Sequence, residues 1–86
     1  MRKRTETQLV DRMIGAHVDW REACHVVHDA YRSWVSATGP HASVAFGRYN
    51  AALDAEQRAA ETYAALVQRV GDLAATDSGL SGPLAA

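Results

Sequence analysis

The sequence predicts an all-α fold: an antiparallel two-helix hairpin that pairs with a second copy to form a dimeric four-helix bundle. Two long segments carry apolar residues at alternating steps of three and four, the spacing of a heptad seam. A Gly-Pro turn signal separates the segments near residue 40. Alanine is abundant and only 2 prolines occur among 86 residues, a composition that favours helix over sheet.

The first helix is expected over residues 6–37, after a flexible stretch at 1–5. Thr5 and Gln8 have the spacing of a capping box at its start. Residues 38–40 form the predicted turn, where Gly39 suits a left-handed cap and Pro40 can open the next helix. The seam of this first helix consists of Val10, Met13, His17, Trp20, Cys24, Val27, Tyr31 and Trp34.

The second helix is expected over residues 41–75, followed by a flexible tail at 76–86. Its seam consists of Phe46, Tyr49, Leu53, Glu56, Ala60, Tyr63, Val67, Val70 and Ala74. With Val10 and Phe46 as heptad position a, both seams occupy positions a and d. In an antiparallel hairpin, the residue numbers of two facing residues add up to a constant, here called the index sum. The two seams match at an index sum of 80, which pairs Trp34 with Phe46. The centre of that register falls on the turn, so local and global patterns agree.

A row of small residues follows position g on both helices. Small side chains let helix axes approach closely, and a lone hairpin would leave Trp and Tyr surfaces in water. The row is therefore predicted as the interface of a homodimer. Its members are Ala16, Ala23, Ala30, Ala45, Ala52 and Ala59.

Polar residues interrupt the predicted core. A carboxylate at Glu56, facing Cys24, must lose hydration and is therefore protonated, paired or bound to metal. We expect it to hydrogen-bond with Arg21 or His28, while a second polar layer pairs His17 with Tyr63. The predicted buried polar cluster thus comprises His17, Arg21, His28, Glu56 and Tyr63.

One alternative is a metal- or redox-responsive bundle. Cys24 and His28 are spaced i, i+4, and with Glu56 they offer thiolate, imidazole and carboxylate ligands for zinc. The favoured interpretation is structural, with Cys24 acting as a small buried hydrophobe. No metal or other cofactor is therefore expected. No catalytic or phosphate-binding motif is present in the sequence either, so a non-enzymatic role is favoured.

Charge gives little support for binding to nucleic acid or membrane. The net charge is −1, from 9 basic and 10 acidic residues. Only residues 1–4 are locally basic, so a small nucleic-acid-associated regulator is the second alternative. No apolar run long enough for a membrane span occurs, and the basic start lacks the apolar stretch of a signal peptide. A single cysteine excludes an internal disulfide framework and fits the cytoplasm.

The length, the central turn and Trp34 resemble the small WXG-type helical hairpins of type VII secretion. The motifs of that family differ, because Trp34 is followed by Val35 and Ser36 rather than by x-Gly. Tyr63 is followed four residues later by Val67 rather than by an acid. The resemblance covers architecture alone. The function expected from the sequence is a cytoplasmic interaction or scaffold module that acts through self-association and through binding of a partner helix.

Overall fold

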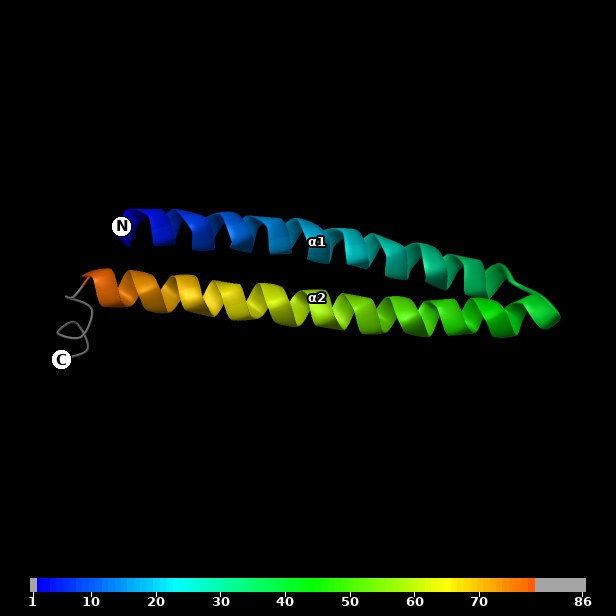
Figure 1. The fold of residues 1–86 in the computed structure, drawn as a ribbon. Helices are drawn as coiled ribbons and strands as arrows, with labels where there is room; N and C mark the ends of the chain where they lie inside the picture. The colour runs from blue at the N-terminus through cyan, green and yellow to red at the C-terminus, as the bar shows by residue number, and fades with distance from the viewer. Residues whose placement is uncertain (1, 79–86) are drawn as a thin grey trace.

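The computed structural model describes residues 2–78, and they form two long helices joined by a tight turn (Figure 1). Helix α1 spans Arg2–Ser36 and helix α2 spans Pro40–Ser78. The helices run antiparallel, and no strand occurs between residues 2 and 78. The predicted all-α hairpin is confirmed.

Both helices extend beyond the predicted bounds. Helix α1 begins at Arg2 rather than near Glu6, because Arg, Lys and Glu are good helix formers and the pattern contains no breaker there. Thr5 therefore lies within the helix instead of capping it. Helix α2 continues through Ser78, three residues past the predicted end. The rest of the predicted flexible tail, residues 79–86, lies outside the described residues.

The turn lies where the sequence predicts it. Gly39 adopts a φ of 59°, the left-handed conformation that costs glycine little because it has no Cβ. The backbone N–H of Ala37 donates to the Trp34 carbonyl at 3.1 Å, and the Ser36 hydroxyl donates to the Arg32 carbonyl at 2.9 Å. The first bond gives a partner to the Trp34 carbonyl in the last turn, and the Ser36 hydroxyl also reaches the Ser33 carbonyl at 3.2 Å.

Ring contacts fix the register between the helices. The centroids of Trp34 and Phe46 are 4.9 Å apart, as the index sum of 80 predicts. The pairs Tyr31–Tyr49 and His17–Tyr63 follow the same sum, at 5.7 and 5.1 Å. The predicted register is therefore confirmed along most of the hairpin.

The face that each helix turns toward the other differs from the predicted a/d seam. The four buried apolar residues, Leu9, Ala16, Ala52 and Leu66, all occupy position g. Positions d flank them and are half-buried, whereas Val10 and Val67, both at position a, are exposed. The contact between the helices is thus centred on g and d. Alanines at g permit close approach of the axes, while the large rings at a, Tyr31 and Phe46, lie exposed beside that contact.

The alanine row predicted as a dimer interface consequently lies at the contact inside the hairpin. Ala16 and Ala52 are each 7% exposed. The other four members are half-buried along the same line. Their small size brings α1 and α2 together, so an interface with a second copy has to use another surface.

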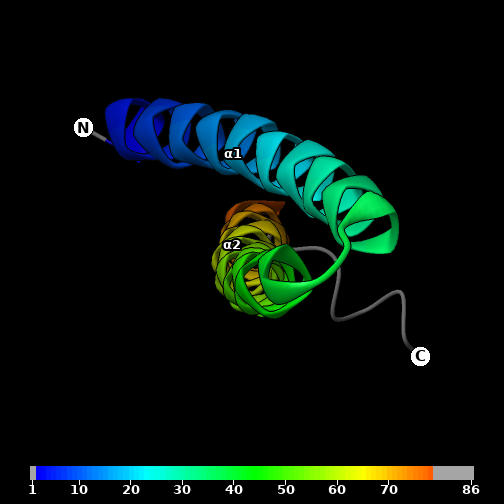
Figure 2. The same cartoon turned by 90° about the vertical axis from the view of Figure 1, so that its right-hand side faces the viewer.

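The hairpin is one layer thick. Figure 2 shows α1 running obliquely over α2, with no third element on either side among the described residues. The smallest dimension of the chain is 13 Å, and its radius of gyration is 19.2 Å against about 12 Å for a compact chain of this length. Domains usually bury their apolar faces between two layers. A single layer leaves both broad sides uncovered, and no side chain among residues 4–76 is fully buried.

Candidate helix-docking face

Six of the nine exposed large apolar side chains in the described residues occupy heptad positions a and e. They are Val10, Ile14, Tyr31, Val35, Phe46 and Val67. In an antiparallel pair, equal heptad positions lie on the same side of the plane through both axes. A groove lined by Glu6, Val10, Val70, Leu73 and Ala74 lies between the helices and brings Val10 and Ala74, both at position a, to the same side. We call the side formed by positions a and e of both helices the a/e face.

The two broad sides of the hairpin differ in charge. From Val10 to Ala74, Arg21 is the one Asp, Glu, Lys or Arg residue at positions a and e of the two helices, and His28, Asn50 and Gln57 are further polar residues at e. Position c, on the opposite side, carries Arg12, Asp19, Arg48 and Arg69, all exposed. One side is therefore largely apolar and the other polar, the pattern of a helix layer that packs on one side only.

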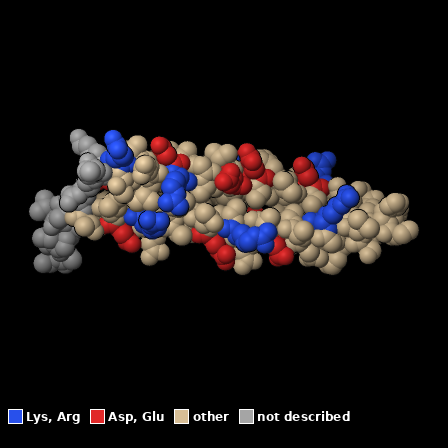
Figure 3. Space-filling view, in the orientation of Figure 1, with Lys and Arg blue, Asp and Glu red and all other residues tan. Residues whose placement is uncertain are grey.

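Charges are interspersed along the hairpin in the view of Figure 3. Acidic and basic side chains alternate along its length, whereas the end with the turn is largely uncharged. Residues 2–4, the locally basic start, form the first turn of α1. Such a mixed surface differs from the continuous basic stripe of a nucleic-acid-binding protein.

Two aromatic groups border the a/e face. Near the turn, Trp34 stacks on Tyr49 at 5.4 Å with an angle of 17° between the rings. Nearer the middle, Trp20 stacks on Tyr63 at 5.8 Å and 11°, and His17 contacts both rings. These contacts stiffen the rim of the face, because offset-stacked rings add about 0.5–1.5 kcal/mol per pair beyond their burial.

Glu56 is hydrogen-bonded to Trp20. The indole Nε1–H donates to Glu56 Oε2 at 2.8 Å, and both side chains are half-buried. The predicted partners Arg21 and His28 are exposed and lie outside this interaction. Glu56 therefore lies at the border of the contact between the helices, with the indole N–H of Trp20 as its hydrogen-bond donor.

The remaining members of the predicted polar cluster lie in different surroundings. His17 and Tyr63 are half-buried and in ring contact. No polar or charged residue among those described is buried, and none of their buried polar atoms lacks a partner. The cluster is thus divided into an aromatic contact, an indole–carboxylate bond and two exposed side chains.

Replacing Glu56 with glutamine is expected to lower the free energy of unfolding by less than about 1 kcal/mol, because the amide oxygen can still accept from Trp20. Glu56→Leu removes the acceptor, and water can reach the half-buried indole instead. We expect a coupling energy of about 1 kcal/mol between Glu56→Leu and Trp20→Phe in a double-mutant cycle followed by urea unfolding. Additive effects of the two substitutions would contradict a stabilising Trp20–Glu56 bond.

The residues considered for zinc do not converge. Cys24 is a half-buried free thiol, and His28 is exposed. Within residues 2–78 no group of three or more His, Cys, Asp or Glu side chains is placed to hold a metal ion. Glu56 is instead directed to Trp20.

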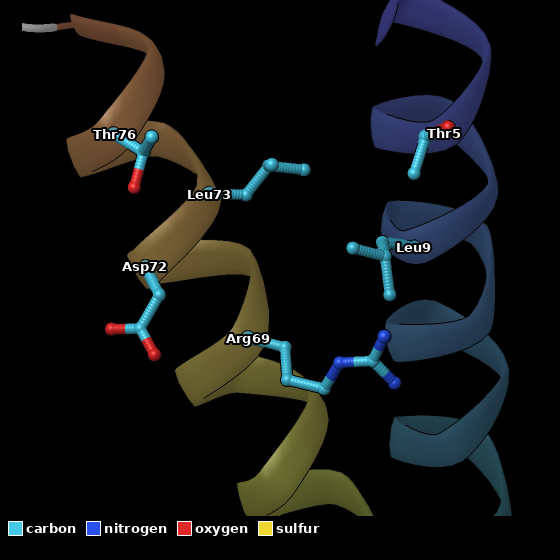
Figure 4. Close-up of a pocket in the computed structure, with 6 residues that line it drawn as sticks. All are labelled: Thr5, Leu9, Arg69, Asp72, Leu73 and Thr76. Carbon is cyan, nitrogen blue, oxygen red and sulfur yellow. The ribbon is translucent and has the colours of Figure 1, made fainter.

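A hollow lies on the polar side, near the ends of the hairpin away from the turn. Its volume is about 410 Å³, and it lies between Leu9 and Leu73 with Arg69 and Asp72 at its edge. In Figure 4, Arg69 extends across the hollow toward α1, and Leu73 points toward Leu9. The hollow is open to solvent, in contrast to the enclosed cleft of a typical small-molecule site.

Within residues 2–78, the hollow lacks the features of a small-molecule site, and the helices lack those of a membrane span. No helix within the described range is both long and apolar enough to cross a bilayer. Comparison with known proteins finds no match: no family model, curated protein or solved structure is significantly similar to this chain.

Proposed function

We propose that this chain is a non-enzymatic helical interaction module that acts by self-association, with the a/e face as its docking surface. The observation that supports the proposal is an apolar side of a one-layer hairpin that nothing in the chain's described part covers. A second hairpin laid on that side would complete a four-helix bundle with a two-layer core.

The exposed area is large enough for such an interface. The chain exposes 6522 Å², whereas a compact protein of 9.3 kDa exposes roughly 5,000 Å². The difference, about 1,500 Å², exceeds the roughly 800 Å² that each partner contributes to an interface of standard size. Covering Val10, Ile14 and Val67 would add apolar burial that the hairpin alone lacks.

The proposal places the module in the cytoplasm, since a single cysteine without a partner suits a reducing compartment. The proposal also includes binding of a partner helix by the a/e face. A helix with apolar residues at every third or fourth position can pack its apolar side into the same grooves. Self-association is the primary activity, and a partner helix would compete with it.

The test is the mass and unfolding of the purified full chain as a function of concentration. We expect light scattering to give the mass of a dimer at micromolar concentration. The melting temperature should rise with protein concentration, because dimerisation stabilises the folded state by mass action. A stable monomer, with a melting temperature that is the same across a hundredfold range of concentration, would overturn the proposal.

A further inference from the structure

We propose that the second copy docks with its α1 over α2 of the first, related by a two-fold axis parallel to the helices. This arrangement rests on the self-association proposed above and specifies its geometry. It brings the a/e faces of both copies together, and each α1 then lies antiparallel to the α2 of the other copy. The occupant of the face is thus another copy of this chain.

The register of the hairpin fixes which residues meet. Within one copy, residues of α1 and α2 lie at the same height when their numbers add up to about 80 to 83, as the contacts of Trp34 with Phe46 and Tyr49 show. A two-fold axis parallel to the helices leaves that height unchanged. The same sum therefore identifies contacts between copies, and it places Ile14 opposite Val67 of the second copy.

Charges beside the a/e face are complementary in this arrangement. On α1, positions b and e carry Arg4, Asp11, Arg21 and Arg32, a net charge of +2, and on α2 they carry Asp54 and Glu61, a net charge of −2. All six side chains are exposed. Arg21 lies at the height of Glu61, since their numbers add up to 82. This pair brings opposite charges together twice in each dimer.

The alternative two-fold axis, perpendicular to the helices within the interface, would stack α1 on α1 and α2 on α2. It would stack the net positive charge of α1 on a second α1 and the net negative charge of Asp54 and Glu61 on a second α2. Like charges at such distances repel. The charge distribution therefore favours α1 over α2.

Two single charge reversals test the arrangement. Arg21→Glu alone and Glu61→Arg alone each create two repulsive pairs in a homodimer, so each should raise the dimer dissociation constant about tenfold at low salt. Mixing the two variants restores two attractive pairs. We expect heterodimers to exceed the statistical half of all dimers, measured by native mass spectrometry with one variant isotopically labelled. The preference should fade at 1 M salt, where the screening length is about 3 Å.

Arg12→Glu, on the polar side of α1, is the matched control and should leave the dissociation constant unchanged. If the unmodified chain dimerises but the mixed variants form a statistical mixture, the arrangement is wrong while self-association stands. If Arg21→Glu tightens the dimer, the perpendicular axis is correct instead. A monomer in all samples, or one that binds anionic phospholipid vesicles through this face, would overturn both proposals.

Discussion

Replacing Ala52 with glutamate is expected to unfold the hairpin. Ala52 is 7% exposed at the closest contact between α1 and α2, so a longer side chain must push the helices apart or leave a charge without a partner. Overpacking and an unpaired buried charge together cost roughly 3 kcal/mol or more. Small domains have only about 5–15 kcal/mol of stability in total, and a one-layer hairpin lies at the low end. Loss of helical circular dichroism at 25 °C is the expected measurement.

The neighbouring Ala51 provides the control, because Ala51→Glu introduces the same side chain on the exposed side of the same helical turn. Its free energy of unfolding should change by less than about 0.5 kcal/mol. Equal effects at both positions would mean that α2 turns another side toward α1. If the Ala52→Glu protein stays folded and loses only its dimer, the alanine row forms the interface between copies instead.

The hairpin itself could be predicted because several independent signals coincide in the sequence. The spacing of apolar residues gives two helices, Gly39 and Pro40 give the turn, and the constant index sum gives the register that Trp34 and Phe46 confirm. Each signal depends on local chemistry or on chain connectivity, both of which are contained in one sequence. The helix bounds were less predictable, since good helix formers extend α1 to Arg2 beyond any capping signal.

The rotation of the helices about their own axes was not predictable from hydrophobicity alone. Positions a, d and g are all largely apolar, so the pattern allows either an a/d or a g/d contact. The size of the side chains decides between g and a: alanines at g let the axes come close, whereas the rings of Tyr31 and Phe46 at a would hold them apart. The g/d contact could be predicted from the volumes of the side chains at a and g, but not from their polarity.

The partner of Glu56 was missed for a related reason. The a/d assignment placed Glu56 opposite Cys24 and directed the search to Arg21 and His28. In the g/d arrangement, Glu56 lies beside Trp20, whose indole N–H needs an acceptor when it is half-buried. Trp20 lies one helical turn from the layer of Glu56 and Cys24, so it can be predicted as the partner of Glu56 when neutral donors are considered together with charged ones.

The double variant Ile14→Glu, Val67→Glu is expected to abolish dimerisation while the hairpin remains folded. Both side chains are exposed in the single copy, at 55% and 43%, so the substitutions cost the hairpin little. In the proposed dimer Ile14 of one copy faces Val67 of the other across the interface, and each buried Ile or Val contributes about 1.5–3 kcal/mol. Four carboxylates would replace them near the middle of an apolar interface. The dissociation constant should rise at least 100-fold, or about 2.7 kcal/mol, by sedimentation equilibrium.

The control for this variant is Val26→Glu, Val44→Glu, which makes the same kind of change at two valines that are 56% and 58% exposed. They occupy positions c and f, away from the a/e face, so the dimer should persist with an unchanged dissociation constant. Because both double variants add the same charge, a general effect of net charge on association would weaken both dimers equally. If only the control variant dissociates, the docking surface is the polar side of the hairpin. If neither variant dissociates, the a/e face is not the interface and is exposed to water in the dimer.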